Sequence, residues 1–113
     1  METAQLLDGV YLRTLDTGAT IDVETRSRRY RLEYLEGDRI RISGHPQWCP
    51  APTLARLWGS SGGSDGFVEG YIGCQMRLVF ERLDDCIPVT TSEVTDVRVI
   101  EQHSADNRRS CHL

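Results

Sequence analysis

The chain contains no lysine, and this absence excludes several chemistries. All 13 of its basic residues are arginines, set against 17 carboxylates and a net charge of −4. Schiff-base chemistry, attachment of pyridoxal phosphate and the lysine-containing phosphate-binding loop all need an amine that this chain lacks. The acidic balance also argues against nucleic-acid binding, which relies on a basic surface. We therefore expect neither a bound cofactor nor a nucleic-acid partner.

Targeting and membrane signals are also missing. The first ten residues, METAQLLDGV, carry no basic segment and no apolar core, so we expect no signal peptide. No apolar run approaches the roughly 18 residues that a membrane-spanning helix requires. Without export, reduced thiols are expected rather than disulfides at Cys49, Cys74, Cys86 and Cys111. These features predict a cytoplasmic protein with no membrane partner.

The length and composition fit one folded domain. A chain of 113 residues has room for a single core, and 39% hydrophobic residues is too many for a wholly disordered protein. The last residues, HSADNRRSCHL, show no periodicity. We expect a single β domain over residues 1–101 and a flexible C-terminal tail over residues 102–113.

Apolar and polar residues alternate with a period of two along much of the chain. In RRYRLEYLEGDRIRIS the apolar side chains point one way, and they are Tyr30, Leu32, Tyr34, Ile40 and Ile42. The segments ATIDVET, MRLVFER and VTDVRVIEQ alternate in the same way. Such alternation is typical of half-buried antiparallel strands. The sequence therefore predicts an all-β fold, a small antiparallel β-barrel or sandwich of six or seven short strands.

Three stretches interrupt this pattern. At most one short helix, of a turn or two, is expected, at TLARLW, because Leu54, Leu57 and Trp58 have helical spacing. Three prolines in GHPQWCPAP, residues 44–52, predict a loop. The stretch GSSGGSDG, residues 59–66, looks at first like a phosphate-binding loop, but it lacks a lysine and leads towards a strand. We interpret it as a mobile connector.

A cluster of arginines around RSRRYR is the candidate ligand site, comprising Arg26, Arg28, Arg29, Arg31 and Arg41. Guanidinium groups on one sheet face suit a nucleotide or a phosphorylated metabolite. Strand parity offers a competing interpretation, because it places Asp22 and Glu24 on the same outer face as the strand arginines and places Glu33 near Arg41. Cross-strand ion pairs would then neutralise the cluster. Arg26 and Arg28, in the turn, are expected to escape such pairing.

The same arginines invite comparison with PilZ-type domains, small β-barrels that bind a cyclic dinucleotide through an Arg-x-x-x-Arg loop and a later Asp/Asn-x-Ser-x-x-Gly strand. The second element is not met, because Arg41 stands where the acidic or amide residue should be and Gly44 directly follows Ser43. The likeness is therefore one of fold alone.

The proline-rich loop carries His45, Trp48 and Cys49. A histidine and a cysteine in this spacing could serve a zinc site or a thiol nucleophile, but no Cys-x-x-Cys pair marks a metal knuckle. A buried cysteine is the simpler interpretation. Trp48 either contacts a partner or covers one end of the barrel.

The second half resembles a pattern in small uncharacterised bacterial all-β domains. The residues that carry the resemblance are GSSGGS, then GYIGCQMRLVF, then TSEVTDV, within residues 59–97. No established activity attaches to that pattern. The resemblance implies strand, loop and strand for this half of the chain, and no site residue.

Three functions remain open from the sequence. The leading hypothesis is a non-enzymatic interaction or self-association module with a protein partner or a second copy. One alternative is a sensor that binds a small anionic ligand through the arginine cluster. The other is a thiol enzyme that uses Cys49 with His45.

Overall fold

The computed structural model of this chain describes residues 5–62 and 66–101. Its strands are β1 (Gln5–Leu7), β2 (Gly9–Tyr11), β3 (Thr20–Thr25), β4 (Arg29–Glu36), β5 (Arg39–Ser43), β6 (Thr53–Ser61), β7 (Phe67–Glu69), β8 (Tyr71–Gly73), β9 (Arg77–Arg82) and β10 (Pro88–Glu101). A single 3₁₀ turn, η1 (Leu12–Thr14), follows β2. Within these residues no helix has the length and apolar character needed to cross a membrane. The predicted all-β class is confirmed.

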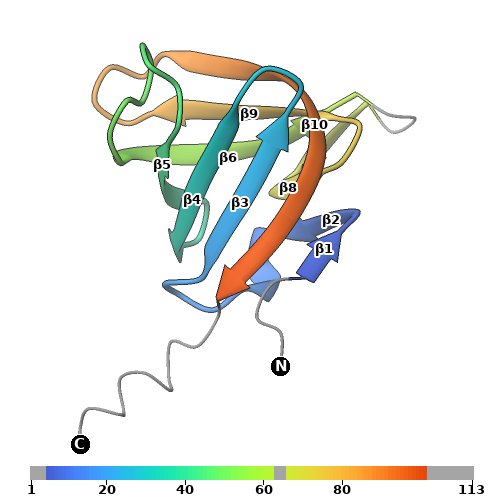
Figure 1. Cartoon of the computed structure of the whole chain (residues 1–113). Helices are drawn as coiled ribbons and strands as arrows, with labels where there is room; N and C mark the ends of the chain where they lie inside the picture. The colour runs from blue at the N-terminus through green and yellow to red at the C-terminus, as the bar shows by residue number, and fades with distance from the viewer. Residues whose placement is uncertain (1–4, 63–65, 102–113) are drawn as a thin grey trace, which may run out of the picture.

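Six strands close into a barrel in the order β10-β3-β4-β5-β6-β9, and β9 pairs back onto β10. All of these pairings are antiparallel. β10 allows the closure because its first half pairs with β9 and its second half with β3, so that it curves across the barrel (Figure 1). Beside this ring β1 pairs with β10 and β7 pairs with β6, and β2 and β8 form a separate ribbon.

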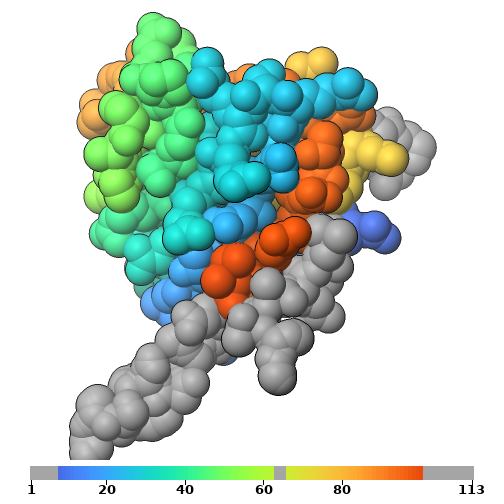
Figure 2. Space-filling model, viewed as in Figure 1, coloured from blue at the N-terminus to red at the C-terminus, as the bar shows by residue number. Residues whose placement is uncertain are grey.

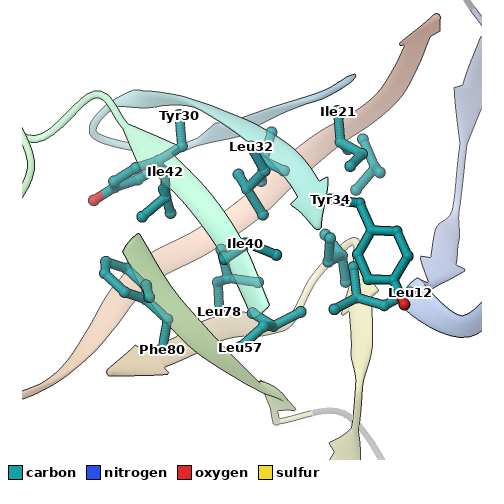
Figure 3. Close-up of a cluster of buried hydrophobic side chains, with 14 of the residues drawn as sticks. Leu12, Ile21, Tyr30, Leu32, Tyr34, Ile40, Ile42, Leu57, Leu78 and Phe80 are labelled. Atoms are coloured by element: carbon teal, nitrogen blue, oxygen red, sulfur yellow. The ribbon is translucent and has the colours of Figure 1, made fainter. Parts of the chain in front are cut away.

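The alternating apolar residues fill the inside of the barrel. The inward set expected from the sequence is buried, including Tyr30, Leu32, Tyr34, Ile40 and Ile42. Figure 3 shows Tyr30, Ile42 and Phe80 gathered at one end of the core, with Tyr34 and Leu12 at the other. The rings of Tyr30 and Phe80 meet edge to face, with 6.4 Å between their centroids. Leu12 closes its end of the barrel from η1.

The prediction of a helix at TLARLW is wrong, because this segment lies within β6. β6 pairs with β5 on one side and with β9 on the other, so backbone hydrogen bonds to two neighbours override the helical spacing. Leu57 points into the core, whereas Leu54 and Trp58 are exposed on the outside. The three residues that suggested one helical face therefore divide between the two faces of a strand.

The glycine-serine stretch is partly strand rather than connector. Gly59 and Ser60 belong to β6, and Ser60 is buried, where its hydroxyl donates to the Tyr71 carbonyl at 2.6 Å and accepts from the Gly73 amide at 3.1 Å. Gly59 has φ 149°, and a Cβ there would lie 2.2 Å from the Val68 carbonyl oxygen. A glycine is therefore required for β7 to approach β6. Residues 63–65 of the predicted connector, and the predicted tail, lie outside the described residues.

Candidate functional site

The outer face of β3, β4 and β5 carries the predicted arginines in ion pairs. Arg31 bonds Asp22 through two nitrogen atoms, at 2.8 and 3.0 Å, and the two residues lie directly opposite each other. Arg29 lies 3.7 Å from Glu24, and Arg41 Nη1 lies 2.9 Å from Glu33. The cross-strand pairing expected from strand parity is confirmed, and it neutralises these three guanidinium groups without a ligand.

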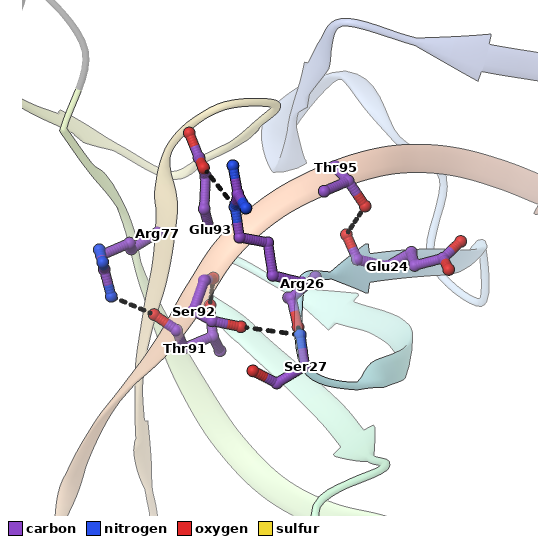
Figure 4. Close-up of polar contacts among 9 residues, drawn as sticks. Glu24, Arg26, Ser27, Arg77, Thr91, Ser92, Glu93 and Thr95 are labelled. Carbon is purple, nitrogen blue, oxygen red and sulfur yellow. Dashed lines mark hydrogen bonds and ion pairs between the residues drawn. The ribbon is translucent and has the colours of Figure 1, made fainter.

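Arg26 was expected to escape pairing, and this is wrong. Its Nε lies 2.8 Å from Glu93 Oε1, and its backbone amide donates to the Glu93 carbonyl at 2.9 Å. The neighbouring Ser27 amide donates to the Ser92 hydroxyl (Figure 4). These contacts fasten the turn between β3 and β4 to β10, which the local sequence could not indicate because the two segments are 67 residues apart.

Arg28 is the one member of the cluster without an ion pair among the described residues. It is exposed directly before β4, and its charge adds to the effect of burial in lowering the pKa of His45. Gly44, next to His45, packs closely against the Arg29 backbone, because a Cβ there would lie 2.3 Å from the Arg29 carbonyl oxygen. The two predicted sites are therefore neighbours in the fold.

The hollows described on the face that carries the paired arginines are small. Figure 2 shows this face, with β3 and β4 in blue to cyan beside β10 in orange. Two hollows on it have volumes of about 120 and 180 Å³. Typical small-molecule sites occupy roughly 300–1,000 Å³. Paired charges and shallow relief together weaken the case for an anion site here.

The loop after β5 forms a tight turn around His45. The Cys49 amide donates to the His45 carbonyl, and the Gly44 amide donates to the Cys49 carbonyl, each at 3.0 Å. His45 Nδ1 accepts the Gln47 amide at 3.1 Å and the Trp48 amide at 3.3 Å. The turn thus places Trp48 against the core.

Trp48 and Cys49 serve packing in this loop. The Arg82 guanidinium lies 5.5 Å from the centre of the Trp48 ring and donates to the Trp48 carbonyl at 2.9 Å. Cys49 is fully buried, and burial raises the pKa of its thiol. A buried thiol with a raised pKa lacks the character of an activated thiolate, and His45 Nδ1 accepts backbone amides rather than the thiol proton. Within the described residues, no three His, Cys, Asp or Glu side chains are grouped to hold a metal.

The His45 turn makes a pH-dependent contribution to stability. Partial burial, and secondarily the charge of Arg28, lower the pKa of His45 below its ordinary value of 6.5. The unfolded chain therefore takes up a proton first, and protonated Nδ1 cannot accept the two amides. We expect the free energy of unfolding to fall as the pH drops below about 6.5. It should level off once the pH lies below the lowered pKa of His45 in the folded protein.

Denaturant unfolding at pH 7.5 and 5.5 measures this change. His45→Asn is the matched control, because an amide oxygen accepts the same backbone amides without titrating. A wild-type decrease no larger than that of His45→Asn would contradict the role of His45.

A second candidate site is a groove on another side of the molecule. It has a volume of about 880 Å³, within the usual range for ligand sites. Its walls come from η1, from the turn between β4 and β5, from β6 and from β7. The lining residues are Leu12, Arg13, Gly37, Asp38, Arg56, Leu57, Trp58, Phe67, Glu69 and Gly70.

Two exposed aromatic side chains dominate this groove. Trp58 is 41% exposed and Phe67 is 47% exposed, and they come from the adjacent strands β6 and β7. The indole nitrogen of Trp58 donates to Glu81 Oε1 at 3.1 Å, which holds the ring in place. Large apolar side chains left in solvent within one concave surface are typical of binding sites.

Charged groups flank the aromatic pair. The Arg13 guanidinium lies 4.3 Å above the centre of the Tyr11 ring, and its side chain remains exposed. Arg56 Nε is buried and lies 3.3 Å from Asp38 Oδ2. It makes no hydrogen bond among the described atoms. Glu69 supplies a second carboxylate. The groove therefore offers apolar surface with both signs of charge at its border.

Sequence reasoning missed this groove. Trp58 was assigned to a helix, and Phe67 was not singled out. Had TLARLW been interpreted as a strand, its alternation would have placed Leu54, Arg56 and Trp58 on the outer face and exposed the tryptophan. The contribution of Phe67 depends on β7 lying beside β6, which no local pattern indicated.

Comparisons were made with models of protein families, with curated proteins and with solved structures, and nothing matches this chain. The resemblance to small bacterial all-β domains therefore stays a prediction, and the candidate site rests on geometry alone.

Proposed function

We propose that this protein is a non-enzymatic binding module that holds apolar or aromatic side chains of a partner protein in the groove lined by Trp58 and Phe67. The observation that carries the proposal is the exposure of Trp58 and Phe67 within one hollow of about 880 Å³. Aromatic side chains give large contact area at a small cost in side-chain entropy, and they dominate binding energy at interfaces.

The chemistry of the groove supports binding rather than catalysis. Its described lining includes no serine, threonine, cysteine, histidine or lysine, which are common nucleophiles in enzymes. Asp38 already contacts Arg56. A partner segment with an apolar centre and a flanking charge of each sign would complement Arg13 and Glu69.

The anion-sensor alternative has less support. Ion pairs engage Arg26, Arg29, Arg31 and Arg41, which leaves Arg28 alone of the predicted five. We propose a cytoplasmic location, because Cys49 and Cys86 form no disulfide among the described residues, as expected in a reducing compartment.

Selection of a displayed random-peptide library on the purified protein tests the proposal. We expect the enriched peptides to share an aromatic or long aliphatic residue. Trp58→Ala should weaken their binding about tenfold or more, because it removes the larger of the two aromatic contacts. The matched control is Trp48→Phe, at the other tryptophan, which should bind like the wild type. A library that yields no binder, or binders that bind Trp58→Ala unchanged, would refute the groove as the site.

A further inference from the structure

β7 leaves one strand edge open beside the groove. Each strand of the barrel ring has a neighbour on both sides, whereas β7 ends the strand order and pairs only with β6 in the described part of the chain. The hairpin of β6 and β7 projects from the side of the barrel (Figure 1). An open edge presents unpaired N–H and C=O groups to whatever can pair with them.

The hydrogen bonds of the hairpin fix which groups of β7 point outward. The Gly62 amide donates to the Gly66 carbonyl at 2.6 Å, and the Gly70 amide donates to the Trp58 carbonyl at 2.9 Å. In an antiparallel ladder, hydrogen-bonded pairs alternate with pairs that are not bonded. The two bonded pairs are four residues apart on each strand, so the pair midway between them is also bonded.

That midway pair is Ser60 with Val68. Val68 therefore directs its backbone N–H and C=O towards β6. The pairs that involve Phe67 and Glu69 are the non-bonded ones, so these two residues direct their backbone groups to the open edge. The same two residues line the groove with their side chains.

We propose that two copies of this chain associate through β7, antiparallel and with the two-fold axis at Val68. Phe67 of one copy then lies opposite Glu69 of the partner subunit, and both residues direct their backbone groups to the shared edge. Each of the two equivalent pairs forms two hydrogen bonds, so the short strand is self-complementary.

The charge of this surface also fits a second copy. The groove lining carries two arginines, Arg13 and Arg56, and two carboxylates, Asp38 and Glu69, so its net charge is zero. The chain as a whole carries −4, whereas two copies that meet through this neutral surface bring no net charge together. In the proposed register each Glu69 lies opposite a phenylalanine rather than the partner's glutamate. The β7 strand of the second copy then lies along the border of the groove. The pairing of the two strands does not depend on a ligand in that groove.

Glu69→Pro tests the pairing with little effect on the hairpin. The Glu69 amide points away from β6, so proline removes no ladder bond within the chain but removes one donor per copy from the shared edge. Glu69→Thr is the matched control, because it removes the same charge and keeps the amide. Sedimentation equilibrium of both variants and of the wild type gives their masses and dissociation constants.

We expect the wild type and Glu69→Thr to have twice the mass of one chain, and Glu69→Pro to raise the dissociation constant about tenfold or more. A monomeric wild type would overturn the proposal whether or not Glu69→Pro folds, as would a folded Glu69→Pro that dimerises unchanged. A monomeric wild type that binds the selected peptides would overturn the second copy as occupant of the edge while leaving the proposed function standing.

Discussion

We expect Phe80→Ala to lower the free energy of unfolding by about 3–5 kcal/mol, the largest effect of any single truncation in this chain. Phe80 is fully buried inside the barrel, where its ring meets Tyr30 edge to face. Truncation to alanine removes these contacts and leaves a cavity that the closed ring of strands cannot collapse around. Denaturant unfolding followed by circular dichroism measures the change.

The only other phenylalanine provides the control. Phe67 is 47% exposed, so Phe67→Ala should change the free energy of unfolding by less than about 0.5 kcal/mol. The same variant should lose binding of the selected peptides, because Phe67 lines the groove. If Phe67→Ala destabilised the protein as much as Phe80→Ala, the assignment of one ring to the core and the other to the groove would be wrong.

Gly59→Ala should be the second most disruptive change, and it should act on the groove. A Cβ at Gly59 would lie 2.2 Å from the Val68 carbonyl oxygen and 2.9 Å from the Glu69 Cα, both backbone atoms of β7. β7 must therefore move away from β6, at a cost of about 1–3 kcal/mol, and Phe67 moves with it. We expect loss of peptide binding together with a lower midpoint of thermal unfolding.

Gly62→Ala separates this steric effect from backbone strain. Gly62 also has a positive φ, 108°, but a Cβ there comes no closer than 3.8 Å, to Met76 Cα. It should share the strain of a positive φ without the clash. Equal losses of stability and of binding in the two variants would show that the close approach of β7 to β6 is not what shapes the groove.

Strand parity was enough to predict much of the fold. The alternation in β3, β4 and β5 determined which residues point inwards, and the same parity placed Asp22 opposite Arg31. These predictions depend on a period of two, which the sequence displays directly. The partners of each strand could not be obtained in this way, because they follow from long-range pairing.

The failures occur where contacts are distant in the chain or local patterns are ambiguous. Leu54, Leu57 and Trp58 satisfy helical spacing, and only pairing with β5 and β9 decides that they form a strand. The ion pair of Arg26 with Glu93 spans most of the chain. The groove was missed for the same reason, because its walls come from four separate segments.

The most direct test of the groove is NMR chemical-shift mapping of the strongest selected peptide on the labelled chain of 113 residues. The largest shifts are predicted at the indole N–H of Trp58, which bonds Glu81, and at the amides of Phe67 and Glu69. The chemical shifts of residues on the outer face around Arg31 should remain unchanged. Largest shifts on that face, or at the Trp48 indole, with an unperturbed Trp58 would contradict the account.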